Sequence, residues 1–137
     1  MKQFWNTVQF SIAAIGGFLG AYLGGLDGFL YALIAFVTVD YITGVLRAIV
    51  EKQLSSRIGA KGIVQKVAIF LVVGICHLID LYLLEGLGMP LRTAVLFFYI
   101  ANEGVSILEN ATAIGLPVPE KLKEVLTLLH EKDGETK

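Results

Sequence analysis

Residues 29–50 read FLYALIAFVTVDYITGVLRAIV, and this run decides the class of fold. Its two charged residues are Asp40, near the middle, and Arg47, towards the end. About 20 consecutive, predominantly apolar residues are enough to cross the hydrocarbon core of a bilayer as a helix. The run therefore predicts a membrane-spanning helix that carries an acid at bilayer depth.

Further hydrophobic segments lie on both sides of this run. The sequence predicts helices over about 4–26, 29–50, 63–84 and 91–114, with a short turn at 85–90. Whether the last of these spans the membrane or lies at its surface stays open, because it is the least apolar. Beyond Pro117 and Pro119, a short amphipathic helix is expected over about 119–131, where apolar residues recur on one face: Leu122, Val125, Leu126 and Leu129.

The predicted fold is an all-α integral membrane protein with three to four transmembrane helices, a C-terminal amphipathic helix and one domain, 1–137. Hydrophobic residues make up 55% of the chain and charged residues only 17%, which is unusual for a soluble domain. A net charge of −1 gives no sign of a nucleic-acid partner. Cys76 is the single cysteine, so no disulfide can form within the chain.

Basic residues predict the orientation of the chain, since short cytoplasmic loops carry an excess of Lys and Arg. They cluster around the second connection: Arg47, Lys52, Arg57, Lys61 and Lys66. If all four segments cross, both termini face the cytoplasm. A signal peptide is the competing interpretation of residues 4–26, but its removal would leave only more hydrophobic segments.

Three glycines in the first hydrophobic segment are candidates for helix packing. Gly16, Gly20 and Gly24 recur every four residues, which would place them on one helix face where another backbone can approach closely. We expect this face to act as an oligomerisation or packing seam. The alternative is that glycine is simply common in membrane helices.

Polar residues in segment 91–114 gather on one side of the expected helix. At about 100° per residue, six of them fall within an arc of about 120°. This polar stripe consists of Tyr99, Asn102, Glu103, Ser106, Glu109 and Asn110. In a bilayer it must face a water-filled space or polar partners, because lipid-exposed charge is costly. The stripe is therefore a candidate pore lining, unless the helix lies flat at the surface.

The other deep acids are candidates for ion pairing within the membrane. Asp40 is expected to pair with Arg47 or Lys66, with pore lining as the alternative. His77 and Asp80 are three residues apart, a spacing that suits a hydrogen-bonded pair. A zinc site would need three or four ligands, so we expect no metal. No phosphate-binding loop or nucleophile motif is present, so we expect neither a cofactor nor an enzyme.

Several short motifs are similar to one known family. They are DYITG at 40–44 with Ala48, KQLSS at 52–56, GAKG at 59–62, NEGVSILEN at 102–110 and LPVP at 116–119 with Lys121 and Leu122. Together they resemble the phage lysis holins and toxin-secretion holins of clostridia and other Firmicutes. The match runs over nearly the whole chain and is weakest before residue 29.

The resemblance implies a protein that accumulates in the host's cytoplasmic membrane, oligomerises with itself and opens lesions. An endolysin, or at some loci a toxin, would leave through them without obligatory direct binding. We expect the polar stripes to be buried first and to turn to water at a threshold. The rival interpretations are a small oligomeric ion channel or transporter using Asp40, Asp80 and Glu103, an intramembrane enzyme built on His77 and Asp80, and a structural scaffold.

Overall fold

The chain folds into helices joined by short connections. Its computed structural model describes residues 1–85 and 91–135, with side chains up to residue 128. The helices are α1 (Lys2–Tyr22), α2 (Gly28–Val50), α3 (Ser56–Tyr82), α4 (Leu91–Ile114) and α5 (Glu120–Glu135). The all-helical prediction is confirmed. The turn predicted at 85–90 lies outside the described residues, apart from Glu85, as does the side chain of Leu129.

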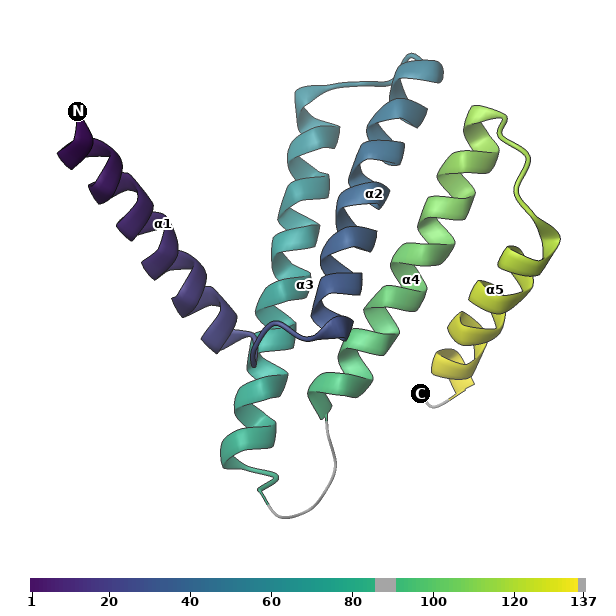
Figure 1. Cartoon of the computed structure of the whole chain (residues 1–137). Helices are drawn as coiled ribbons and strands as arrows, with labels where there is room; N and C mark the ends of the chain where they lie inside the picture. The colour runs from purple at the N-terminus through teal and green to yellow at the C-terminus, as the bar shows by residue number, and fades with distance from the viewer. Residues whose placement is uncertain (86–90, 136–137) are drawn as a thin grey trace.

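The helices α2, α3 and α4 form a bundle in which α3 runs antiparallel to α2 and α4, and α4 lies against both others (Figure 1). These three, among the described helices, are long and apolar enough to cross a membrane. Their 23, 27 and 24 residues extend over about 35 to 40 Å, compared with about 30 Å for a hydrocarbon core. α4 is the least apolar of the three, as the sequence indicates.

The core of the bundle is a small apolar cluster between these three helices. Leu30 and Leu33 of α2, Val73 of α3 and Leu96 of α4 are fully buried. The outer surface of the bundle is apolar as well, with large side chains such as Ile75 half exposed. An apolar exterior around a small core is what a lipid-facing bundle requires.

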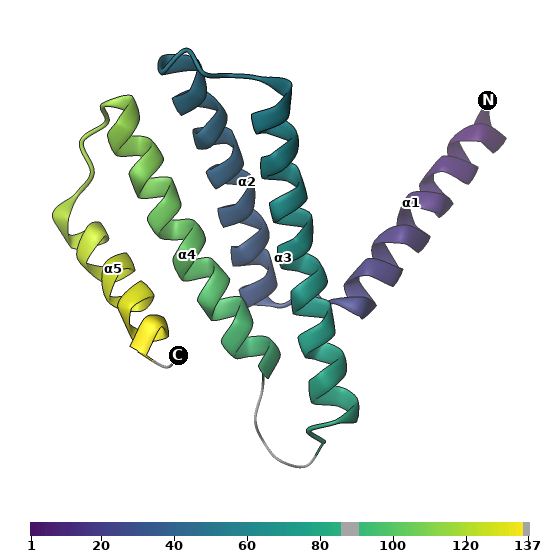
Figure 2. The ribbon, with the colours of Figure 1, turned by 180° about the vertical axis from the view of Figure 1, so that it is seen from behind.

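The first helix diverges from the bundle at its N-terminal end, as the two opposite views show (Figures 1 and 2). None of the residues of α1, all of which the structure describes, is buried. α1 is also not among the helices apolar enough to span a membrane. Its attachment is Tyr22, whose hydroxyl donates to the Leu71 carbonyl at 3.0 Å and whose ring packs directly on Gly74 of α3.

The ends of α1, α3 and α5 differ from the predicted ones, and the start of α3 has a clear local cause. α1 ends at Tyr22, not near residue 26. α3 begins at Ser56, seven residues before the predicted start at 63, because the Ser55 side chain caps it by accepting from the Ile58 N–H at 3.2 Å. α5 begins at Glu120, close to the predicted start, but continues to Glu135, beyond the predicted end at about 131. It folds back along α4, where Leu126 lies beside Gly104.

Candidate functional site

A cluster of three charged residues joins the three long helices. Lys66 of α3 donates from its ammonium group to Asp40 Oδ2 of α2, and to Glu103 Oε2 of α4 at 2.8 Å. Asp40 and Glu103 are each only 6% exposed, and the Lys66 side chain is 18% exposed. We call these three residues the Lys66 triad.

The position of the triad makes it costly unless it is paired. Each member lies well inside its helix, so the triad sits near the middle of the bundle's length. A charged group in the interior of a membrane must find a partner or water, and Lys66 supplies the partner to both acids. Two carboxylates and one ammonium carry a formal charge of −1. The charges at bilayer depth thus bind the three helices to one another.

Asn110 extends the network towards the end of α4. Its Nδ2 donates to Asp40 Oδ1 at 3.1 Å and to Thr43 Oγ1 at 3.0 Å. Arg47, by contrast, forms its ion pair with Glu51 at 3.1 Å, and its Nη1 donates to Asn110 Oδ1 at 3.5 Å. Of the two cations considered for Asp40, the structure places Lys66 against it, whereas Arg47 pairs with Glu51. Arg47 lies a turn from the helix end, where water and Glu51 are within reach.

The polar stripe of α4 faces the inside of the single chain over most of its length. Glu103 and Asn110 are buried, and Tyr99, Asn102 and Ser106 are half buried. Only Glu109 is exposed among the six residues. For Glu103 and Asn110, the buried members of the stripe, the polar partners are Lys66 of α3 and Asp40 and Thr43 of α2 in the same chain.

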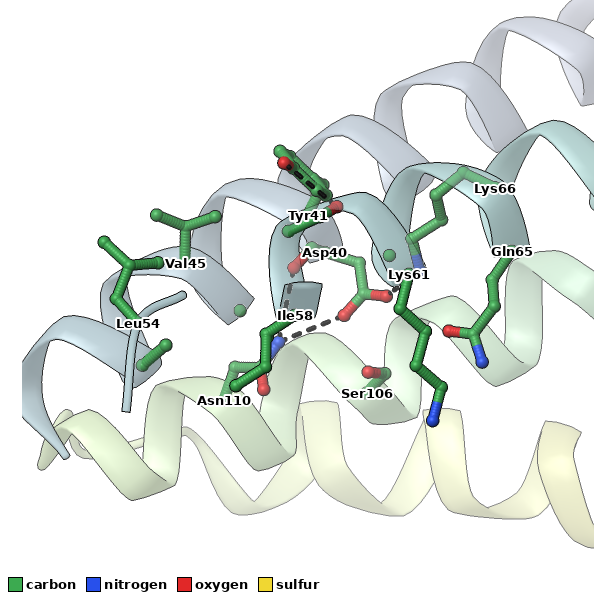
Figure 3. Close-up of a pocket in the computed structure, with 14 residues that line it drawn as sticks. Asp40, Tyr41, Val45, Leu54, Ile58, Lys61, Gln65, Lys66, Ser106 and Asn110 are labelled. Carbon is green, nitrogen blue, oxygen red and sulfur yellow. Dashed lines mark hydrogen bonds and ion pairs between the residues drawn. The ribbon is translucent and has the colours of Figure 1, made fainter. Parts of the chain in front are cut away.

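A pocket of about 390 Å³ opens beside the triad, between α2, α3 and α4 (Figure 3). It lies towards the Glu51–Ser55 connection, because its lining includes Leu54 and the first turns of α3. Asp40 and Lys66 lie at its inner end, and Ser106 and Asn110 form its α4 wall. We call it the loop-side pocket.

Asp80 has a structural partner other than the one predicted. Its Oδ1 accepts from the Leu91 N–H at 2.8 Å and its Oδ2 from the Arg92 N–H at 2.7 Å, which caps the first turn of α4. No hydrogen bond joins Asp80 to His77 in the part of the chain that the structure describes. The predicted hydrogen bond between His77 and Asp80 is therefore wrong. The N–H groups at the start of α4 bind the Asp80 carboxylate instead.

Arg92 ties the α1–α2 linker to α4, a role that sequence analysis did not predict. Its side chain donates to Asp27 Oδ2 at 2.8 Å and to the Gly25 carbonyl at 3.0 Å, and it also bonds the Leu23 carbonyl. The hydrogen bond from Arg92 lowers the pKa of Asp27, which lies outside the helices and caps α2. A lone arginine at the start of an apolar segment is the signal that could have suggested a buried bond.

The predicted three-glycine face is shorter than expected. Gly24 lies beyond the end of α1 with φ +88°, where a Cβ would stand 2.6 Å from Arg92 Nε and 2.7 Å from His77 Nδ1. It is therefore a turn residue under Arg92, not a member of a helix face. Gly16 and Gly20 remain on α1, and no atom of another element that the structure describes lies within 4 Å of a Cβ placed at either position. Among the described residues, no three His, Cys, Asp or Glu side chains form a possible metal site.

Comparison with known proteins places the chain in a family. The sequence model of the bacteriophage holin family matches residues 17–131. A protein of Listeria monocytogenes is 42% identical over 93% of this chain and 90% of its own length. A 14.9 kDa protein of Clostridium perfringens is 39% identical over 96% and 99%, respectively. A protein of Bacillus phage phi105, described as a probable holin, is 39% identical over 85% and 84%.

No solved structure matches the chain. The family model covers most of the sequence, from the end of α1 to within α5, and so includes all three helices that are able to span a membrane. The Listeria and Clostridium relatives align with this chain over 90% and 99% of their own lengths. This chain is therefore a membrane protein that belongs to the bacteriophage holin family.

Proposed function

We propose that the chain is a phage-type holin that oligomerises in the cytoplasmic membrane and opens lesions large enough to release an endolysin or a toxin, so that the host cell lyses. Membership of the holin family and the name of the phage phi105 relative support this function. The required partners are further copies of the chain and the lipid bilayer. The released protein needs no direct contact with the chain.

The observation that carries the mechanism is the Lys66 triad. A bundle of three spanning helices is too small to enclose a wide channel, so lesions have to form between copies. In the single chain, α2 and α3 cover Glu103 and Asn110 of the polar stripe of α4. We therefore propose that Glu103 exchanges its contact with Lys66 for water when the lesion opens, while α4 turns its stripe outward.

The free energy needed to separate the ion pair and the free energy available from the membrane potential are of similar size. Separating one partner from a buried ion pair costs about 3–5 kcal/mol. Moving one elementary charge across the full membrane potential is worth about 2.3 kcal/mol per 100 mV. A change in membrane potential is therefore large enough to shift the balance between the closed bundle and the opened assembly.

Oligomerisation would use α1, the helix that the bundle leaves uncovered. Gly16 and Gly20 are open to the approach of another helix, and both would lie on its surface. Gly20→Leu is expected to reduce the size of the oligomer in cross-linking and gel filtration, with Ile15→Leu as the control on the other face. An oligomer of unchanged size would remove α1 as the seam.

Orientation follows from the basic connection between α2 and α3, which we place in the cytoplasm. Three crossings then put α5 on the cytoplasmic side. The N-terminal end of α1 lies on the same side of the bundle as that connection (Figure 1). If α1 also crosses the membrane, the N-terminus is therefore cytoplasmic. Labelling of single cysteines in a Cys76→Ser background, from each side of the membrane, tests both termini.

The decisive experiment is induction in bacteria with and without a cytoplasmic endolysin. We expect abrupt lysis only when both proteins are present, because the endolysin needs the lesion to reach the cell wall. The rival function of ion channel or transporter predicts loss of ions and small dyes without release of folded protein. Retention of a cytoplasmic fluorescent protein after depolarisation would therefore overturn the holin proposal.

A further inference from the structure

The helix α5 packs on the bundle through a narrow contact. Leu126 lies beside Gly104 of α4, where a Cβ would stand 3.0 Å from Leu126 Cδ2 and 3.2 Å from Phe36 Cε2 of α2. Leu122 and Val125, which share a helix face with Leu126, remain 45% and 49% exposed. An open hollow of about 470 Å³ lies between α4 and α5. The apolar face of α5 is therefore only partly covered by the bundle.

The charges of α5 are arranged as in a helix that lies on a membrane. At about 100° per residue, Glu120 and Glu124 fall opposite the apolar face. Lys121 lies at one border between the polar and the apolar face, and Lys123 lies at the other. In the sequence, the acidic row and the first basic border are continued by Glu131 and Lys132. A lysine at such a border can keep its alkyl stem among apolar groups and its ammonium group among headgroups.

The docked position places this polar face at the depth of the lipid chains. Gly104 is the fourteenth of the 24 residues of α4, so Leu126 lies near the middle of a helix that is able to span the membrane. Glu124 is exposed and lies two residues, or about 3 Å, from the level of Leu126. The hydrocarbon core extends about 15 Å on either side of its middle. Docked α5 would therefore expose a carboxylate to lipid, which is costly.

The connection between α4 and α5 allows α5 to turn away. It consists of residues 115–119, which are mostly exposed and include Pro117 and Pro119. Gly115 has φ +100°, and a Cβ placed there would meet no described atom within 4 Å. The connection leaves α4 at the end of the bundle where the α2–α3 connection also lies (Figure 1). Rotation about these residues would move α5 to that surface of the membrane without any change in the bundle.

We propose that α5 detaches from α4 in the bilayer and binds the membrane surface at this end of the bundle, with Leu122, Val125 and Leu126 inserted among the headgroups. Its sequence holds five acids and three lysines, a formal charge of −2, so its partner is the lipid surface in general and not an anionic headgroup. Leu126 serves both positions, so docking on α4 and binding to lipid exclude each other. The inference uses the position of the bundle in the membrane and does not depend on the opening of lesions.

The position of α5 is tested by spin labels on the full chain, with Cys76→Ser as the background and phosphatidylcholine vesicles as the membrane. Labels at Leu122→Cys and Glu124→Cys report the two faces of α5. We expect oxygen, which dissolves in lipid, to reach the Leu122→Cys label better than a water-soluble nickel chelate does. The Glu124→Cys label should show the opposite order. Docked α5 predicts instead that the Glu124→Cys label is reached by oxygen and shielded from nickel.

A distance measurement separates the two positions independently. A label at Ala94→Cys, an exposed position near the start of α4, is paired with the label at Glu124→Cys. The docked arrangement predicts about 20 Å between them, from the helix rise and the spacing of packed helices. Detachment predicts more than about 30 Å, because twenty residues of α4 separate Ala94 from Ile114. The pair Ala94→Cys and Glu109→Cys, both on α4, is the control and should stay at about 22 Å.

Two substitutions test whether the apolar face holds α5 on the lipid. Val125→Asp places a charge on that face and should abolish the difference between oxygen and nickel at the Leu122→Cys label. Thr127→Asp is the matched control on the polar face and should preserve the difference. Circular dichroism checks that both variants keep their helices. Vesicles that also contain phosphatidylglycerol should give the same result as pure phosphatidylcholine.

Five results would overturn the proposal. A distance of about 20 Å in bilayers would show that α5 stays on α4, and a long distance with equal nickel access at both labels would place α5 in water. Equal effects of Val125→Asp and Thr127→Asp would remove the apolar face as the cause. Binding only with phosphatidylglycerol would assign the contact to headgroup charge. Label accessibility that changes when the chain is diluted in lipid would assign it to a second copy. A failure of lysis in cells would affect only the proposed function.

Discussion

Glu103→Gln is the substitution that tests the proposed opening step most directly. It removes one formal charge from the Lys66 triad and leaves Lys66 paired with Asp40. The amide oxygen of glutamine can still accept from the Lys66 ammonium group, which lies 2.8 Å from Glu103 Oε2. We therefore expect the variant to fold and to accumulate in the membrane, with a triad that is formally neutral.

The effect on triggering follows from the depth of the triad. A charge near the middle of the membrane that moves to one face crosses about half of the field, worth about 1.2 kcal/mol per 100 mV. Loss of a 100 mV potential should then shift the ratio of closed to opened chains about sevenfold in the original protein. Glu103→Gln should abolish most of this shift, so lysis should respond little to an added uncoupler. It should also begin earlier, because opening no longer separates the ion pair between Glu103 and Lys66.

The assay is the lysis curve of cells that carry an endolysin, with protein level checked by immunoblot. Glu109→Gln is the matched control, because it removes the same charge from the same helix at an exposed position outside the triad. We expect it to lyse cells at the normal time. Normal timing and normal uncoupler response in Glu103→Gln, or an equal change of timing in both variants, would refute the reasoning.

Three further substitutions probe the supports of the bundle. Lys66→Gln should destabilise the chain by about 3–5 kcal/mol, because it leaves two buried carboxylates without a cation. We expect lower accumulation in the membrane and a lower melting temperature in detergent. Normal stability would contradict this expectation. Gly74→Val should detach α1, because a Cβ at this position would overlap the Tyr22 ring. The distribution of distances between spin labels on α1 and α3 should then broaden. An unchanged distribution would refute the attachment. Asp27→Asn keeps the capping oxygen of α2 but loses the charge that pairs with Arg92. Since the pKa of Asp27 is lowered from 3.8, the difference in stability between the variant and the original protein should persist at neutral pH. It should vanish only as the pH falls below about 3.8. A difference that disappears nearer pH 6 would count against the pair of Asp27 and Arg92.

Sequence reasoning succeeds here where the information is local. Apolar runs predict the long helices, and Pro117 and Pro119 predict the break before α5. It fails at the start of α3, where Arg57 and Lys61 look like part of a polar loop. The signal was present in Ser55, a residue that favours helix N-caps.

The contacts between helices could not be predicted in the same way. Spacing along one helix cannot show that residue 103 meets residue 66, because only the packing of α4 on α3 brings them together. For the same reason, the polar stripe predicts a two-faced helix but not which partner covers it. Arg92 bonds residues more than 60 positions away, beyond the reach of any periodicity.

The bond between Arg92 and the linker also bears on how the protein is made. The ribosome delivers residues 23–27 long before residue 92, so the carbonyls of Leu23 and Gly25 emerge without the guanidinium group that later satisfies them. The N-terminal half of a newly synthesised chain must then wait for α4 before the linker can adopt its final geometry. Closure of the linker is in this way coupled to the synthesis of α4, and a truncated chain that ends before Arg92 keeps the contact of Tyr22 with α3 but lacks the side chain that holds residues 23–27.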